Sequence, residues 1–360
     1  MALLAGVLAL PCCLAQQQVP APEGGATGMT LHVTVRELQV AALVLDDHRR
    51  VVSNLDPSRF RLHIERRKPF PPMRFHRQGD DPFTLAVVMD VSHENRFRSQ
   101  LPDALAQLRQ TALLPHDRLL LFAVDCKGVV YRGNTGTPDN TRTGATELLA
   151  SPLVHETTAN GKPRTCGDRV HLFDEIVFAL RNVAVQPGRH TVLVVSDGLD
   201  MGSIAKMSDL EEFATNSATT VFVQPSFDMS GPNVRRSSLE PLVMMSGGVV
   251  LDEPGKDGLA NSFETCVKML RERFILGFNQ PSNLRAGHNE LHVTVDHANY
   301  DIRSSGVSAP NAMPVSDKPQ PDQPGPPPGV RPGQPVPPGQ HAGPSISSGY
   351  TQPGPGRRPT

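Results

Sequence analysis

The chain has 360 residues, of which 35 are proline and 30 are glycine, and its formal net charge is −1. Proline is about twice as frequent as in average proteins, but the share of apolar residues is ordinary, which excludes a chain that is disordered or collagen-like throughout. A net charge this close to zero provides no strong basic field, so we expect no nucleic-acid partner.

The N-terminal 15 residues have the features of a secretory signal peptide. They are almost wholly apolar and end in small residues (MALLAGVLALPCCLA). The run is too short to cross a bilayer, which requires about 20 apolar residues. We therefore expect a signal peptide over 1–15, a linker over 16–27, and an exported protein, periplasmic or extracellular, without a transmembrane helix. A lipoprotein signal at Cys12 or Cys13 is the alternative.

The C-terminal segment accounts for the high proline content. Residues 310–360 contain 16 of the 35 prolines and few apolar residues. Such a segment cannot bury enough apolar surface to offset its ordering entropy, so we expect a disordered Pro/Gly-rich tail over 307–360. Two interpretations of the tail remain open: a solvated spacer, or a segment that contacts the cell envelope.

Between these ends, the chain is predicted to begin with a small β-domain over 28–78. Apolar and polar residues alternate over 31–45, 60–64 and 73–76, with turn residues between these segments and a shorter β-segment at 49–52. Alternation over short segments is typical of strands with one buried face.

From residue 83 the pattern changes to continuous apolar runs separated by helical stripes. We expect buried strands at 83–89, 118–124, 191–195 and 220–223, and shorter ones at 129–131 and 249–251. Helices are expected at 99–114, 168–183, 208–217, 238–245 and 258–273, the third with a capping box formed by Ser208 and Glu211. This alternation predicts an α/β fold over 79–273 with a doubly wound, mainly parallel sheet. Strands over 274–306 either pair with the N-terminal β-domain or extend the sheet.

Two strand ends resemble the von Willebrand factor A domain. They are LAVVMDVSHE at 85–94 and VLVVSDGLD at 192–200. The flanking segments VSNLDPSRF at 52–60 and RFILGFN at 273–279 resemble those of an exported bacterial group, the VWFA-related proteins. The resemblance covers residues 30–306 and implies a Rossmann-like α/β domain.

The resemblance also implies a metal-ion-dependent adhesion site, in which D-x-S-x-S, a Thr and an Asp bind Mg²⁺ or another divalent cation. Asp90, Ser92 and Asp197 match this pattern, Glu94 replaces the second Ser, and the Thr position falls on Val170. Two outcomes stay open: a more acidic site in which Glu94 is a ligand, or a metal-free site in which Asp90 and Asp197 bond only to loop amides.

Three cysteines remain if the signal is cleaved. Of these, Cys126 and Cys166 bracket a long connection from Arg132 to Cys166, and we expect them to form a disulfide. The connection is expected to be a loop, since most connections are far shorter. It would suit partner recognition, or it is a poorly ordered insertion.

The sequence indicates a non-catalytic protein, because no G-x-S-x-G elbow, G-x-G-x-x-G or P-loop motif follows a strand. The leading hypothesis is protein–protein interaction through the C-terminal edge of the sheet, with an unidentified partner. The alternative is a structural or envelope-associated protein, in which the β-domain and tail make the contacts.

Overall fold

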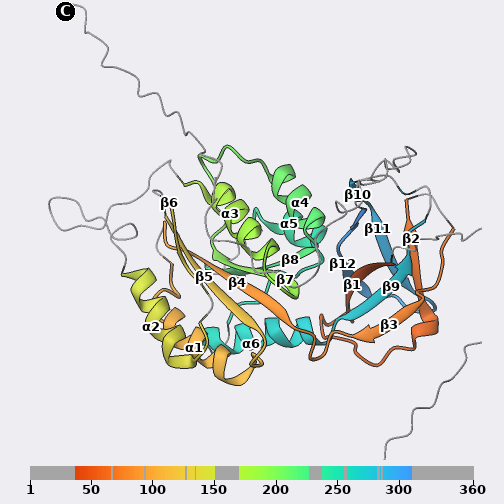
Figure 1. Ribbon diagram of the computed structural model, residues 1–360, viewed down its shortest axis with the longest axis horizontal. Helices are drawn as coiled ribbons and strands as arrows, with labels where there is room; N and C mark the ends of the chain where they lie inside the picture. The colour runs from red at the N-terminus through yellow and green to blue at the C-terminus, as the bar shows by residue number, and fades with distance from the viewer. Residues whose placement is uncertain are drawn as a thin grey trace, which may run out of the picture. The chain divides into compact units, whose positions relative to one another are not determined.

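The computed structural model describes residues 37–65, 68–92, 95–125, 128–133, 135–150, 170–226, 237–254, 258–281, 284 and 287–309 (Figure 1). The predicted signal peptide, the linker, nearly all of the tail, Glu94, Cys126 and Cys166 lie outside the described residues. All of the described residues belong to the first of two units into which the chain divides, Met1–Asn311.

A five-stranded sheet forms the centre of the α/β part. Its strand order is β6 (Gly128–Arg132), β5 (Arg118–Asp125), β4 (Phe83–Asp90), β7 (Arg189–Ser196) and β8 (Thr219–Pro225). Neighbouring strands from β5 to β8 pair in parallel, and β6 pairs antiparallel with β5. Every residue of β4 is buried, as expected for a strand covered on both faces. The prediction of a mainly parallel sheet is confirmed.

Helices cover both faces of this sheet (Figure 1). One face packs against α1 (Leu101–Thr111), α2 (Pro138–Leu149) and α6 (Gly258–Arg271), and the other against α3 (Leu172–Ala184), α4 (Met207–Asn216) and α5 (Glu240–Met245). Along β4, Leu85 and Val87 face the first group, whereas Ala86 and Val88 face the second. Each fully buried Leu or Val contributes about 1.5–3 kcal/mol. Among the described residues, no helix is long and apolar enough to span a bilayer.

The remaining strands, called the β-layer here, come from both ends of the described chain. They are β1 (Glu37–Leu45), β2 (Phe60–Ile64), β3 (Arg74–Arg77), β9 (Phe274–Asn279), β10 (Gly287–Asn289), β11 (Leu291–Val295), β12 (Asp301–Ser304) and β13 (Val307–Ala309), with a 3-10 turn at Pro57–Arg59. Their pairing orders are β12-β1-β9-β3, β11-β2 and β10-β13. A separate core that includes Phe60, Leu276 and Val293 lies between them. Of the two arrangements the sequence left open, the C-terminal strands therefore pair with the N-terminal ones.

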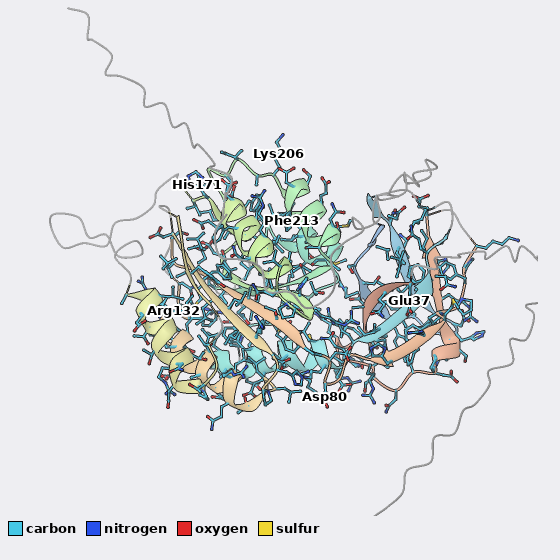
Figure 2. All side chains as sticks on the ribbon, in the orientation of Figure 1. Glu37, Asp80, Arg132, His171, Lys206 and Phe213 are labelled. Atoms are coloured by element: carbon cyan, nitrogen blue, oxygen red, sulfur yellow. The ribbon has the colours of Figure 1, made fainter. Side chains whose placement is uncertain are left out.

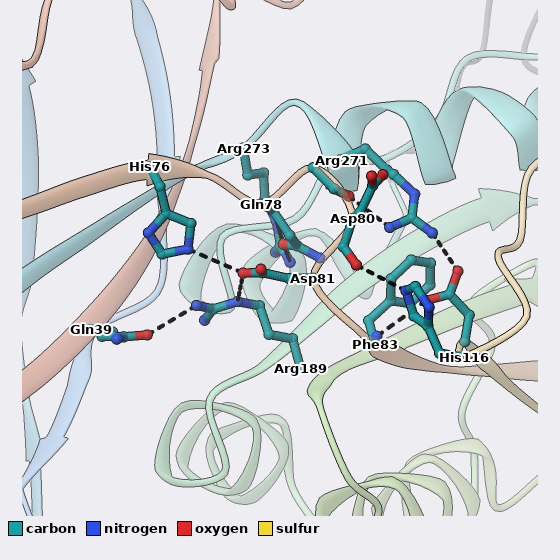
Figure 3. Close-up of polar contacts among 12 residues, drawn as sticks. Gln39, His76, Gln78, Asp80, Asp81, Phe83, His116, Arg189, Arg271 and Arg273 are labelled. Atoms are coloured by element: carbon teal, nitrogen blue, oxygen red, sulfur yellow. Dashed lines mark hydrogen bonds and ion pairs between the residues drawn. The ribbon is translucent and has the colours of Figure 1, made fainter.

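A polar junction joins the β-layer to the N-terminal ends of the parallel strands (Figure 3). Arg189, at the start of β7, donates a 3.0 Å hydrogen bond to the side chain of Gln39 and lies 3.7 Å from the carboxylate of Asp81. Arg273 is buried and donates to Oε1 of Gln78 (3.2 and 2.7 Å) and to Oγ1 of Thr220 (2.6 Å). Burial lowers the pKa of Arg273 to about 9. The N-terminal edge of the sheet is thus occupied by internal contacts, whereas the C-terminal edge carries loops.

The predicted long loop contains a helix, so that prediction is wrong over 138–149. Oγ1 of Thr137 accepts a 3.2 Å hydrogen bond from the Asn140 amide at the start of α2, and Pro138 occupies the first turn. Thr141, Ala145 and Leu148 are buried at helical spacing. A capping Thr followed by Pro is a helix start signal that the sequence carried.

Other boundaries also differ from the sequence-based expectation. Helix α4 begins at Met207, and Asp209 accepts a 2.8 Å bond from the Lys206 amide, so the capping box assigned to Ser208 and Glu211 is wrong. The segments predicted as strands at 49–52 and 249–251 each form only an isolated bridge in the structure, between Leu45 and Val51 and between Val223 and Val250. Residues 307–309, assigned to the tail, form β13 against β10.

Candidate functional site

The candidate site lies at the C-terminal edge of the sheet, here meaning the loops that follow β4 and β7. Asp90 ends β4 and Ser196 ends the adjacent parallel strand β7. Parallel strands deliver their carboxyl ends to one edge, which is where ligands of open α/β sheets bind. Residues far apart in the sequence therefore meet here.

Asp90 is the centre of a buried hydrogen-bond cluster. Its Oδ1 accepts bonds from the amide (3.0 Å) and hydroxyl (2.5 Å) of Ser92, and its Oδ2 accepts from the hydroxyl of Ser196 (2.5 Å). Asn95 donates a 2.9 Å bond to the Asp90 carbonyl. Burial raises the pKa of Asp90 above its usual range, even though the bonds from the Ser196 hydroxyl and from the hydroxyl and amide of Ser92 act in the opposite direction.

Asp197 follows Ser196 and shapes the next turn. Its Oδ1 accepts a 2.9 Å bond from the Leu199 amide, and the Gly198 amide donates a 2.9 Å bond to Oγ of Ser196. Gly198 has φ +77°, and an added Cβ would lie 3.0 Å from Oγ of Ser238, which donates to the Gly198 carbonyl. This turn therefore requires glycine.

These observations decide the fold assignment: the order β6-β5-β4-β7-β8, an Asp-x-Ser turn after the central strand, and Ser196-Asp197-Gly198 after its neighbour. The fold is von Willebrand factor A-like. The sheet and its helices are called the A-like domain below.

No known family model and no curated protein matches the sequence. Solved structures resemble the fold. The vWF domain of the type V pili tip protein Mfa5 from Porphyromonas gingivalis is 12% identical, with 53% of this chain and 95% of that chain covered and a TM-score of 0.37. The conserved hypothetical protein BatB from Bacteroides thetaiotaomicron is 14% identical, with 52% and 98% covered and a TM-score of 0.32. An aerotolerance-related membrane protein from Bacteroides fragilis NCTC 9343 is 9% identical, with the same coverage and TM-score. These likenesses concern the fold alone.

Of the predicted metal-site residues, the structure brings Asp90 and Ser92 into direct contact. Asp197 lies in the adjacent turn, close enough for its charge to raise the pKa of Asp90, and Glu94 lies outside the described residues. Val170 is 1% exposed, and its carbonyl accepts a 3.0 Å bond from the Met201 amide. The A-like domain thus holds an apolar side chain at the Thr position.

The described side chains fit a divalent cation poorly. The hydroxyl groups of Ser92 and Ser196 donate to Asp90, which engages both of its carboxylate oxygens. Within the described part of the chain, no three His, Cys, Asp or Glu side chains are grouped so that they could hold a metal ion. Mg²⁺ prefers octahedral coordination by oxygen ligands, and Val170 supplies none. Metal binding through Glu94 stays a prediction.

Glu175 also belongs to this edge of the A-like domain and is not among the site residues predicted from the sequence. It lies on α3, is 6% exposed, and occupies the same helix face as Leu172, Ile176 and Ala179. Burial, followed by the negative charges of Asp90 and Asp125, raises its pKa to about 9. The sequence carried a signal for this residue, because Glu175 lies on the apolar stripe of a predicted helix. A charged carboxylate buried there destabilises the folded state unless it is protonated or paired.

The loop after β7 is fixed to the start of α3. Oδ1 of Asp200 accepts bonds from the Phe173 amide (3.1 Å) and from Oγ of Ser203 (2.5 Å). The two carboxylate oxygens of Asp174 accept from the amides of Ile204 (3.0 Å) and Ala205 (2.8 Å). The carboxylates of Asp200 and Asp174 thereby satisfy the backbone amides of Phe173, Ile204 and Ala205 at this edge. Figure 2 labels His171 and Lys206 on these two segments.

Proposed function

We propose that this chain is an exported, non-catalytic protein whose A-like domain binds a protein partner through the C-terminal edge of its sheet. The observation that carries the proposal is that the 197–206 loop exposes Met201, Gly202, Ile204 and Lys206 and yet is held by hydrogen bonds along its length. Binding residues are often found on loops positioned by a rigid scaffold. A loop already ordered in the free protein loses less entropy on binding.

The non-catalytic part of the proposal is supported by how the edge hydroxyls are used. Both carboxylate oxygens of Asp90 accept hydrogen bonds from the hydroxyls of Ser92 and Ser196, and the Asp90 side chain is buried, so these groups are held inside the domain rather than presented to a substrate. We expect no turnover of esters, peptides or phosphate esters by the purified chain. Turnover that is lost in Ser196→Ala or Asp90→Asn would refute this part.

We further propose that the metal-ion-dependent adhesion site is degenerate. The support is Val170 at the Thr position and the engagement of Asp90 with two serine hydroxyls. We expect titration of the full chain with Mg²⁺ or Mn²⁺ to give no binding heat in a calorimeter and no rise in melting temperature. Saturable heat that disappears in Glu94→Gln would instead establish the more acidic metal site.

Photocrosslinking tests the binding edge. A p-benzoylphenylalanine residue would be placed at Leu199, on the C-terminal edge, and at Val185, which is 80% exposed at the other end of α3. Both variants would be mixed with an extract of the native cell envelope. We expect specific adducts, identified by mass spectrometry, from Leu199 and none from Val185. Equal adducts from both positions, or none from Leu199, would contradict the proposal.

The alternative, an envelope protein with an inert A-like edge, is tested in the same experiment. Met73 is 67% exposed at the start of β3 and offers a third position for the crosslinker. Specific adducts from Met73 in the absence of adducts from Leu199 would favour contacts through the β-layer.

A further inference from the structure

Two apolar side chains of the 197–206 loop are exposed. Met201 is 50% exposed and Ile204 is 90% exposed, the largest exposed fraction among the large hydrophobic side chains of the described residues. A single exposed apolar residue is common on protein surfaces and is no evidence by itself. The evidence lies in what surrounds these two.

Hydrogen bonds hold the backbone around both residues. The Met201 amide donates to the Val170 carbonyl (3.0 Å) and the Ile204 amide to Oδ2 of Asp174 (3.0 Å). At the end of the loop, the Lys206 amide donates to Oδ2 of Asp209 (2.8 Å). The exposed side chain of Ile204 therefore extends from a backbone that is already ordered, and such a residue loses less conformational entropy when it binds a partner.

The neighbouring residue Gly202 shows how closely the loop packs. A Cβ at Gly202 would lie 3.1 Å from Cε1 of His171, so the histidine ring lies against the loop backbone. Nδ1 of His171 is 3.7 Å from Oδ2 of Asp174. The loop backbone at Gly202 thus packs against His171, the residue before α3, while the side chains of Met201 and Ile204 on either side stay exposed.

The charges beside the two apolar side chains are mainly negative. Asp174, Asp200 and Asp209 each bond to the 200–206 segment, and Lys206 is the formal cation among the described residues of that segment. Three carboxylates and one ammonium give a formal charge of −2 with His171 neutral. This loop would repel a partner surface that carries acidic groups and attract one that carries basic groups.

We propose that Ile204, supported by Met201, is the main contact residue of the binding edge and inserts into an apolar pocket whose rim carries Lys or Arg, on a protein partner. This proposal rests on the proposed function and names the chemistry of the partner. Apolar anchors in desolvated pockets carry most of the binding energy of an interface, and rim charges set orientation and rate.

A phage-displayed random peptide library, selected on the immobilised full chain, is the probe. We expect enrichment of peptides in which apolar residues are flanked by Lys or Arg. The dissociation constant of the best peptide should rise by about tenfold or more in Ile204→Ser. The dissociation constant should stay unchanged in Val185→Ser, which removes a similarly exposed apolar side chain far from the loop. Ile204→Leu, which keeps an apolar side chain, should have a dissociation constant close to that of the parent chain. Raising NaCl from 50 to 500 mM should weaken binding several-fold, because the rim contacts are screened.

Enriched peptides without a basic and apolar pattern, or equal affinities for the parent chain and Ile204→Ser, would overturn the inference. Because Ile204 is held through its backbone amide, the serine variant keeps the loop bond, and equal circular dichroism spectra of the two chains check this. Adducts from Leu199 that persist at full yield in Ile204→Ser would refute this inference but leave the proposed function intact. Loss of these adducts in Ile204→Ser would support the inference, whereas absence of adducts from Leu199 when Ile204 is unchanged would refute the proposed function.

Discussion

Replacement of the buried Glu175 by Gln should change the pH dependence of stability. The native environment raises the pKa of this carboxyl from 4.5 to about 9, chiefly by burial and then through the charges of Asp90 and Asp125. The native state therefore keeps the proton at neutral pH, whereas the unfolded chain releases it. Because the native state binds the extra proton, the free energy of unfolding is highest below pH 4.5 and falls as the pH rises toward 9.

The size of the effect follows from the same shift. One pH unit within this window corresponds to about 1.4 kcal/mol, so protonation of Glu175 at pH 7 costs the native state about 3 kcal/mol. Gln keeps the shape of the protonated side chain and has no proton to lose. We expect the variant and the parent to differ by about 1 kcal/mol or less at pH 5. Between pH 5 and 8 the variant should gain about 4 kcal/mol relative to the parent.

Urea unfolding followed by circular dichroism at pH 5, 6, 7 and 8, in buffer that contains a chelator, measures both free energies. Glu212→Gln, on the exposed side of α4, is the control and should follow the parent at every pH. If the free energies of unfolding of the parent and of Glu175→Gln change equally with pH, the claim that Glu175 is protonated in the native state is refuted.

Three further predictions concern the scaffold. Gly248→Ala should lower the free energy of unfolding, measured by heat or urea, by about 3 kcal/mol or more, because the added Cβ would lie 1.8 Å from the Val221 carbonyl oxygen. Gly136→Ala is the control: an added Cβ there has no atom within 4 Å, so the free energy of unfolding should change by less than about 1 kcal/mol. Cys266 is buried and its pKa is raised to about 12, so peptide mass spectrometry should find it unmodified by iodoacetamide in the native chain and modified in urea; equal labelling in both would contradict its burial. Asp117→Ala should cost about 3–5 kcal/mol, because the buried carboxylate accepts bonds from two backbone amides and a guanidinium, and a loss below about 1 kcal/mol would show that these bonds contribute little.

Much of the central sheet could be predicted from the sequence because its strands are apolar on both faces. The run at 83–89 has no polar side chain other than Thr84, and such a run is stable only between two layers of helices. The same reasoning failed at α2, where polar residues dominate and the buried face consists of Thr141, Gly144, Ala145, Leu148 and Leu149. A helix with so narrow an apolar stripe resembles a loop in composition.

The candidate site was predictable only in part. The turns at Asp90 and Asp197 follow apolar strands, and their positions were therefore recoverable from the sequence. The partnership of Ser196 with Asp90 was not, because 106 residues separate them and only strand pairing brings them together. The same holds for Glu175, whose pKa is raised by burial in the folded domain and then by carboxylates from β4 and β5.

The sequence by itself determined the alternation of buried strands and helices, since periodicity and apolar content depend on each segment alone. The tertiary structure decided the pairing of the first strands with the last, the strand order of the sheet and the fixation of the 200–206 loop by Asp174. These depend on contacts between segments distant in sequence, whose loop-closure entropy must be offset by burial and hydrogen bonding in the folded whole.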